Sequence, residues 1–360
     1  MFKKAAAASI ALLGLSNVAA AQITTGPTCP LPQLADTAVL EPLPGTDLVT
    51  VPVAINGTPK HFLLDIGTSP TEIAQATVTQ MGLPEDAKLT ESISGQASGM
   101  PQGNLGALTN GSLGGVSVYD VRDKTGAGGA RTRIRVASFT IGRATSKSLM
   151  FLVANDADMG NPQAEPYDGL LTGDFFKQYD VELDFAGKQI NWLTPTKCTD
   201  PLQVVFWSHY EVGAIPMTIA DGKIQVQVLA EGRSINAVID TSSPRTVMRR
   251  DIAELIFGFK ADTPEMTPSG DLKDGQGQPV YVHTFSQIAF AGGVTAQNVP
   301  TLIQANSLTH EINRQKVLGS WARAADARLP DLTLGMDVLQ KLHMYIIPGQ
   351  GKVYVTSVQF

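Results

Sequence analysis

Hydrophobic and polar positions alternate in two stretches that follow the same plan. VTVPVAINGTPKHFLLD spans residues 49–65, and IQVQVLAEGRSINAVID spans residues 224–240. Each has an alternating run, a turn with glycine, a more continuous apolar run and a final aspartate. Gly57 and Gly232 each lie eight residues before that aspartate. The pattern predicts two β-hairpins, each with an aspartate at the end of its second strand.

A second pair of matching stretches lies further along the chain, at residues 167–193 and 331–356. Each predicts an apolar strand, a Gly-containing turn, a short helical turn and a hairpin closed by Gly and Lys. Two half-chains that share one plan indicate an internal duplication. The polar, Pro-containing stretch at residues 194–203 marks the boundary, so we expect an N-terminal lobe at 22–198 and a C-terminal lobe at 199–360.

The remaining pattern is mostly that of β-structure. RIRVASFTIG at 133–142 and VYVHTFSQIAF at 280–290 alternate as strands do. Turn residues recur about every 8 to 12 positions, as expected for barrels and sandwiches. Helix signals are few, and two of them, at 71–82 and 249–257, follow the two aspartates in parallel. The fold class predicted is all-β, with two duplicated β-barrel lobes.

Composition narrows the classes of function. The chain has 360 residues, of which 43% are hydrophobic and 17% charged, which suits a globular protein of two domains. The formal net charge is −6, and no cluster of Lys and Arg stands out after the N-terminal segment. Because nucleic-acid binding calls for a basic patch, we expect no nucleic acid as a partner.

The N-terminus has the pattern of an export signal. MFKK is basic, AAAASIALLGL is apolar, and Ala19–Ala21 precede Gln22 with the small residues of a cleavage site. We therefore expect residues 1–21 to be a signal peptide and the protein to be periplasmic or secreted. A retained anchor is the alternative. No later apolar run reaches about 18 residues, so no stable membrane anchor is expected.

The only two cysteines, Cys29 and Cys198, follow the predicted signal peptide. An oxidising compartment permits a disulfide between them, with two unpaired thiols as the alternative. Neither cysteine has the spacing of a redox motif or a zinc site. We expect no metal and no cofactor.

The duplication suggests that the two aspartates, Asp65 and Asp240, act as a pair. A carboxylate at the end of a buried strand is costly unless it is hydrogen-bonded, and small hydroxylated residues follow both Asp65 and Asp240. Packing of the lobes about a pseudo-twofold axis would bring the two turns together. Two close carboxylates share a proton, so that one deprotonates a water while the other protonates a carbonyl oxygen.

The phrases LLDIGTSPT and VIDTSSPRT resemble the Asp-Thr-Gly motifs of aspartic proteases, both two-lobed pepsin-like and retropepsin-like. LLTGDFF and LTLGMDVL resemble the family strand that passes beside the catalytic turn. The resemblance covers residues 47–358. It implies a pepsin-like fold with a central cleft, a catalytic dyad of Asp65 and Asp240, a protein or peptide substrate and a two-lobed monomer.

The resemblance also implies supporting roles around the dyad. In the family the threonine after each aspartate bonds across to the opposite turn; Thr241 can do so, whereas Ile66 has no hydroxyl. Gly67 is the family glycine, and Ser242 replaces it in the second lobe. Thr172 stands where the first-lobe strand normally has glycine. Thr68 and Ser243 lie where family members use a hydroxyl to hold the outer carboxylate oxygen.

Other hydrolase classes find no support, because the histidines form no HExxH motif and no GxSxG elbow accompanies them. The leading hypothesis is an exported aspartic endopeptidase. Its alternative is a catalytically impaired relative that binds peptides or acts like an inhibitor, and Ile66 and Ser242 favour it. A third interpretation is a structural β protein of the cell envelope.

Overall fold

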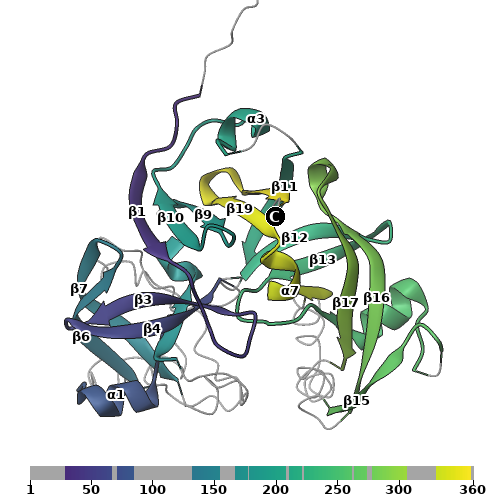
Figure 1. Ribbon diagram of the computed structural model, residues 1–360, viewed down its shortest axis with the longest axis horizontal. Coiled ribbons are helices and arrows are strands. Elements are labelled where there is room, and N and C mark those ends of the chain that lie inside the picture. The colour runs from purple at the N-terminus through teal and green to yellow at the C-terminus, as the bar shows by residue number, and fades with distance from the viewer. Residues whose placement is uncertain are drawn as a thin grey trace, which may run out of the picture.

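The computed structural model describes residues 29–66, 71–84, 132–154, 167–176, 178–207, 211–220, 223–261, 263–273, 278–305 and 330–357. Two β lobes lie side by side, with a group of strands above and between them (Figure 1). The predicted all-β, two-lobed fold is confirmed. The predicted signal peptide, residues 1–21, lies outside the described residues.

The first lobe is built on a 7-stranded sheet in the order β2-β3-β4-β8-β5-β7-β6, in which β3 also pairs with β6. That extra pairing bends the sheet back on itself in the manner of a barrel. The strands are β2 (Glu41–Pro42), β3 (Val49–Ile55), β4 (Thr58–Asp65), β5 (Glu72–Ala74), β6 (Arg133–Ile141), β7 (Ala144–Ala154) and β8 (Gly169–Thr172).

The second lobe repeats this arrangement. β13 pairs in parallel with β18, as β4 does with β8, and β14 pairs in parallel with β17, as β5 does with β7. Its strands are β12 (Lys223–Ala230), β13 (Arg233–Ile239), β14 (Val247–Arg249), β15 (Thr267–Lys273), β16 (Pro279–Ala289), β17 (Thr295–Gln304) and β18 (Leu332–Leu334).

The two hairpins predicted before the aspartates are present and use the same turn. Asn56 and Gly57 have φ of 49° and 79°, and Glu231 and Gly232 have φ of 46° and 78°. Positive φ at both central residues is the geometry that two-residue hairpins favour, and it explains the glycine at the second position. The internal duplication therefore extends from the sequence to the backbone conformation.

A run of strands joins the lobes within the 13-stranded sheet, in the order β1-β10-β9-β19-β20-β11. They are β1 (Leu34–Val39), β9 (Asp180–Asp184), β10 (Gln189–Leu193), β11 (Gly213–Ala220), β19 (Leu342–Ile347) and β20 (Lys352–Ser357). β9 pairs with β19, so a strand from before residue 198 contacts one from the end of the chain. The lobe boundary at residues 198 and 199 stays a prediction.

Helices are short. They are α1 (Gln75–Met81), α3 (Pro201–Val204), α4 (Arg250–Ile252) and α7 (Met336–Leu339), with single-turn η2 (Gly173–Phe176), η3 (Ala253–Phe257), η4 (Ala291–Gly293) and η5 (Pro348–Gln350). The helix predicted at 71–82 begins only at Gln75, because Glu72–Ala74 pair with β7 and β8 instead. Sheet pairing there overrides the local helix signal.

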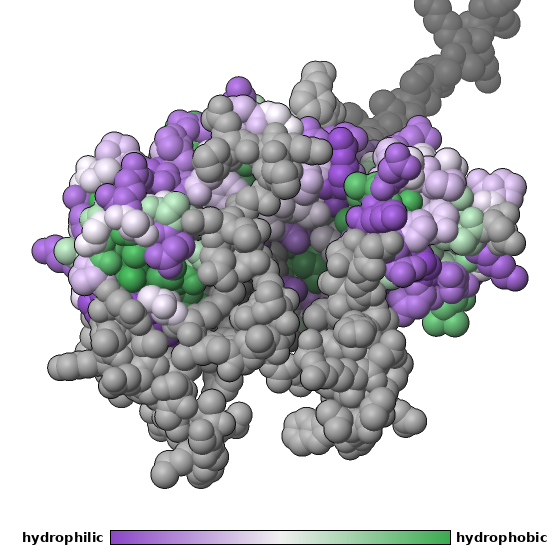
Figure 2. All heavy atoms as spheres, turned by 90° about the horizontal axis from the view of Figure 1, so that it is seen from below, coloured by the Kyte–Doolittle hydropathy of each residue, from purple (hydrophilic) through white to green (hydrophobic). Residues whose placement is uncertain are grey.

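Apolar side chains fill both lobes. In the first lobe Phe62, Phe139 and Phe151 are each at most 1% exposed, and their ring centroids lie 5.1–6.0 Å apart. The disulfide between Cys29 and Cys198 is present, as predicted. Hydrophobic and hydrophilic side chains are interspersed over the face in Figure 2, with a larger hydrophobic area on the first lobe, at the left. Among the described residues no helix has the length and apolar character of a membrane span.

Candidate active site

Asp65 is the last residue of β4 and is 1% exposed. Its strand runs parallel to β8, which places Asp65 in register with Thr172. The predicted supporting residues Gly67 and Thr68 lie outside the described residues. The structure therefore places Asp65 at the end of a buried strand, as the apolar run before it indicates.

Asp240 directly follows β13 and holds the equivalent position in the second lobe. Its backbone N–H donates to Leu334 O at 3.1 Å, beside the parallel strand β18. One carboxylate oxygen, Oδ1, accepts three hydrogen bonds: from Ser242 N at 2.9 Å, Ser242 Oγ at 2.7 Å and Ser243 N at 3.2 Å. These donors fix the orientation of the carboxylate.

Thr241 connects the two aspartate turns. Its hydroxyl donates to Leu64 O at 2.7 Å and accepts from Ile66 N at 3.1 Å. Leu64 and Ile66 are the two neighbours of Asp65 in the chain, so one buried hydroxyl joins the turn after Asp240 to both sides of Asp65. Ile66 is fully buried and has no hydroxyl to return the contact. These two bonds form a lock between the turns, and among the described residues only the second lobe supplies a side chain to it.

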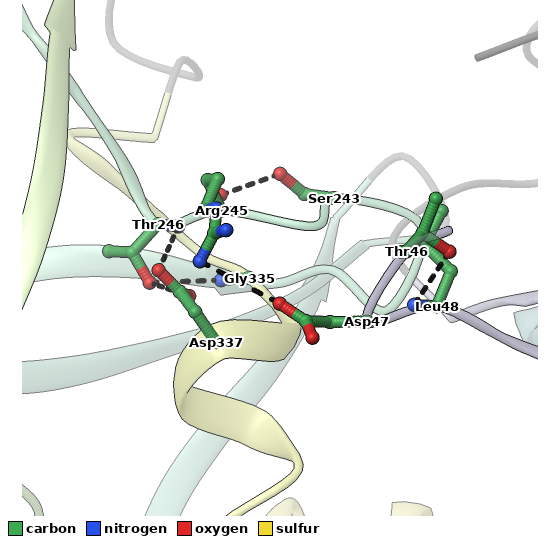
Figure 3. A network of polar contacts seen from close by, with 8 residues as sticks. All are labelled: Thr46, Asp47, Leu48, Ser243, Arg245, Thr246, Gly335 and Asp337. Atoms are coloured by element: carbon green, nitrogen blue, oxygen red, sulfur yellow. Dashed lines mark hydrogen bonds and ion pairs between the residues drawn. The ribbon is translucent and has the colours of Figure 1, made fainter. Parts of the chain in front are cut away.

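The hydroxyl that reaches the Asp240 carboxylate belongs to Ser242, the residue in place of the family glycine. The resemblance assigned that part to Ser243. Instead, the Ser243 hydroxyl donates to Arg245 O at 2.7 Å, as Figure 3 shows. Ser243 contacts the carboxylate through its backbone N–H alone. The turn after Asp240 thus places the Ser242 hydroxyl on the Asp240 carboxylate and the Ser243 hydroxyl on the backbone oxygen of Arg245.

A buried polar network supports the second turn from behind (Figure 3). The Thr246 hydroxyl donates to Asp337 Oδ1 at 2.7 Å, and Thr246 N donates to Asp337 Oδ2 at 3.0 Å. Gly335 N donates to the Thr246 hydroxyl at 3.2 Å. In the first lobe the matching bond runs from Thr172 N to the Thr71 hydroxyl at 3.4 Å. Both lobes therefore tie the strand beside the aspartate to the threonine six residues after it.

Gly335 and Thr172 hold equivalent positions with different side chains. A Cβ on Gly335 would lie 2.4 Å from both the carbonyl carbon and the oxygen of Arg245, so a larger residue cannot fit without a backbone shift. Thr172 is fully buried, and its hydroxyl lies 3.0 Å from the Thr71 hydroxyl. In the first lobe, Thr172 in place of glycine thus contributes a hydrogen bond with the Thr71 hydroxyl.

An ion pair also crosses between the lobes near the second turn. Arg245 Nη1 lies 3.6 Å from Asp47 Oδ2 (Figure 3). The two side chains are 60% and 40% exposed. An exposed pair of this kind contributes little to stability. The pair instead helps to position the loop that follows Asp240, because it adds to the Thr241 bonds a further contact with the first lobe.

Tyr167, which the sequence analysis did not single out, is a further ionisable group near Asp65. Burial raises the pKa of Tyr167 to about 12, and the negative charges of Asp65 and Glu72 contribute to the increase. The phenol is therefore neutral over the acidic and neutral pH range and stays a hydrogen-bond donor. No motif marks it, and it lies two residues before β8, the strand that pairs with β4.

Two of the hollows that described residues line do not include Asp65 or Asp240 in their lining. One of about 230 Å³ includes Leu48, Phe185 and Met336 in its lining, and one of about 60 Å³ lies beside Trp192. The central cleft stays a prediction. Within the described ranges no group of three or more His, Cys, Asp or Glu side chains could hold a metal ion.

Comparison with known proteins identifies the family. Residues 51–123 and 224–338, together just over half of the chain, match the Aspartyl protease family. The two matched segments contain the two aspartate turns. The chain belongs to the aspartyl protease family.

Solved structures give matches of low sequence identity. A retropepsin-like aspartic protease from Rickettsia conorii is 16% identical, with a TM-score of 0.28, over 40% of this chain and 91% of its own. Basic 7S globulin from soybean is 11% identical, with a TM-score of 0.45, over 90% and 95%. Conglutin gamma, a basic 7S globulin from lupine seeds, is 13% identical, with a TM-score of 0.45, over 91% and 96%. No curated protein matches the sequence.

Proposed function

We propose that the protein is an aspartic endopeptidase, in which Asp65 and Asp240 form the catalytic dyad. The observation that carries the proposal is the contact of Thr241 with both neighbours of Asp65, at Leu64 O and Ile66 N. This contact holds the two aspartate turns against each other. Family membership without it would leave the relative position of the carboxylates open.

In this mechanism a water molecule is bound between the two carboxylates. The ionised one accepts a proton from the water, which attacks the carbonyl carbon of a peptide bond, while the protonated one donates to the carbonyl oxygen. The three donors on Asp240 Oδ1 hold that carboxylate in one orientation during the exchange of protons. Such preorganisation lowers the cost of reaching the transition state.

The substrate we propose is an extended protein or peptide segment, bound between the lobes of a monomer. We further propose that the protein acts after export, in the periplasm or outside the cell. The Cys29–Cys198 disulfide supports an oxidising compartment, because such bonds persist where thiols are not kept reduced.

The test is a peptidase assay on an unfolded protein substrate between pH 3 and 7, with and without a pepstatin-type inhibitor. We expect hydrolysis that the inhibitor suppresses. Absence of hydrolysis at every pH, with the protein shown to be folded, would contradict the proposal. Hydrolysis that the inhibitor leaves unchanged would point to a contaminating peptidase and count against it as well.

A second candidate is a peptide-binding protein that has lost catalysis, and the environment of Ile66 favours it. Ile66 is fully buried among apolar residues at the position where a hydroxyl would complete the lock. Under this alternative, a fluorescent peptide would bind saturably, the pepstatin-type inhibitor would compete with it, and the peptide would be recovered uncut.

A further inference from the structure

The strands that join the lobes carry a cluster of ionisable side chains on one face. Asp180 and Glu182 of β9 are two residues apart, so both point to the same side of the sheet. Tyr345 of β19 lies opposite Glu182, and His343 lies opposite Asp184. The carboxylates belong to a strand before Cys198, whereas the histidine and the tyrosine belong to the end of the chain.

His343 forms the most direct contact across this junction. Its Nε2 lies 2.8 Å from Glu182 Oε1, and the two side chains are only 14% and 6% exposed. The imidazole stacks on the Trp207 indole with ring centroids 3.9 Å apart and an interplanar angle of 9°. Glu182 also accepts a hydrogen bond from Asn191 Nδ2 at 2.9 Å. An imidazolium here would donate to a carboxylate and lie over an aromatic face.

Asp180 is the more deeply buried carboxyl, at 1% exposed. Its Oδ2 accepts a hydrogen bond from Thr196 N at 2.7 Å, and the Tyr345 hydroxyl lies 3.5 Å from the same oxygen. Within the described residues no lysine or arginine forms a hydrogen bond or ion pair with Asp180 or Glu182. An ionised Asp180 would therefore place a second negative charge beside Glu182.

The other charged and titratable groups around this face do not compensate that charge. On β20 the Tyr354 hydroxyl donates to Gln350, and Lys352 lies over the Tyr354 ring at 6.0 Å. Asp184 accepts from Gly187 N, in the turn that ends β9. Asp200, at the start of α3, adds a further negative charge, which contributes to raising the pKa of Tyr354. The cluster is thus rich in carboxylates and poor in cations.

We propose that Asp180, Glu182, His343 and Tyr345 form a pH-sensitive clamp between the lobes, which tightens in acid and loosens towards neutral pH. Protonation acts in the same direction at two places. It removes the charge of Asp180 in its buried position, and it gives His343 a positive charge opposite Glu182. The proposal concerns the junction of the lobes and does not depend on catalysis.

The raised pKa of Asp180 agrees with the proposed direction of the pH dependence, in which the clamp is tighter in acid. Burial raises the pKa of Asp180 from 3.8 to about 6, against the lowering effect of the hydrogen bonds from Thr196 and Tyr345. Because the folded value exceeds the ordinary one, the stabilising contribution is full below pH 3.8 and is lost as the pH rises through about 6. Between pH 5 and 7.5 this residue alone would increase the equilibrium constant for opening on the order of tenfold.

Hydrogen exchange of the full-length chain at pH 5 and 7.5 tests the clamp, with rates corrected for intrinsic exchange. Peptides covering β9 and β19 report on the junction, and peptides covering β3 and β4 provide an internal reference. The variants are Asp180→Asn, which keeps the acceptor for Thr196 N without a titratable group, and His343→Gln, which keeps a donor for Glu182. Asp36→Asn is the matched control, because the buried Asp36 carboxylate accepts backbone N–H groups of the first-lobe residues Arg143 and Ala144.

In the wild type we expect opening of β9 and β19 to increase on the order of tenfold from pH 5 to 7.5, relative to β3 and β4. Asp180→Asn removes most of this increase, His343→Gln reduces it, and Asp36→Asn retains it. Equal protection of the wild-type junction at both pH values would overturn the proposal. An unchanged increase in Asp180→Asn would overturn it too, as would failure of that variant to fold at pH 5, where the wild-type carboxyl is already protonated.

Discussion

The two aspartate turns share a backbone plan but differ in how side chains complete it. Each aspartate ends a strand that runs beside a parallel strand, and each is followed six residues later by a threonine that accepts from that neighbouring strand. At the position after the aspartate, however, Thr241 reaches across to the other lobe, whereas Ile66 is packed among apolar residues.

The difference shows that, among the described residues, the position directly after the aspartate joins the two turns from the second lobe alone. The single Thr241 hydroxyl makes both the donor and the acceptor contact with the first lobe, at Leu64 O and Ile66 N. In the second lobe the Ser242 hydroxyl adds a donor to Asp240, where the family glycine would offer none. Asp240 therefore has hydroxyl and N–H donors around its carboxylate, and the position after Asp65 contributes apolar packing.

The strongest test of the pairing is removal of either carboxylate. If the two turns form one dyad, Asp65→Asn and Asp240→Asn should each reduce the peptidase rate by about 10²–10⁴-fold or more, because each role requires a titratable group. Circular dichroism and thermal melting would show that the fold is retained. Activity close to that of the wild type in either folded variant would rule that aspartate out of the dyad.

The next test exchanges the residues that differ beside the turns. Gly335→Ala should lower the free energy of unfolding by about 3 kcal/mol, because the new Cβ meets the Arg245 backbone at 2.4 Å. Thr172→Ala should cost only about 1 kcal/mol, the net value of its contact with the Thr71 hydroxyl. Urea denaturation of both variants measures the two costs. Equal costs would mean that the lobes differ less here than their contacts indicate.

Position 66 can be used to complete the lock. Ile66→Thr introduces the missing hydroxyl, and Ile66→Val provides a control of nearly the same shape without it. A bond across the lobes contributes about 0.5–1.5 kcal/mol, so we expect a higher peptidase rate for Thr than for Val. If the position has been repacked for apolar contact, the buried hydroxyl costs about 1–3 kcal/mol instead. A lower melting temperature for Thr than for Val, with no hydrolysis in any form, favours the peptide-binding alternative.

The smallest expected effect comes from replacing the two serines after Asp240, one at a time. Ser242→Ala removes one of the three donors on Asp240 Oδ1, so the pH–rate profile should shift and the rate should fall several-fold. Ser243→Ala breaks the bond to Arg245 O and should cost about 1 kcal/mol of stability without a shift of the profile. The comparison requires pH–rate profiles and melting curves of both variants. A shifted profile in Ser243→Ala alone would reverse the roles assigned here.

The repeated phrases allowed the hairpins, the duplication and the two-lobed fold to be predicted, because hydrophobic alternation and Gly turns are local signals. Contacts between segments that are distant in the sequence could not be predicted in this way. Nothing near Glu182 indicates that it will meet His343, since strand pairing across the lobes depends on the whole fold. Turn geometry decided which serine reaches Asp240, and sheet pairing converted the start of a predicted helix into β5. The resemblance to aspartic proteases did imply that the Thr241 hydroxyl could reach the opposite turn.

The disulfide has a consequence for the covalent connectivity of the molecule. With Cys29 joined to Cys198 across a sequence separation of 169, the first part of the chain is a closed ring. One cut of the backbone inside this ring opens it but releases no fragment, whereas one cut after residue 198 divides the molecule into two pieces. On a denaturing gel without reductant, a protein nicked within the ring would keep its full mass. Damage to the first lobe would thus be retained, and damage to the second lobe would not.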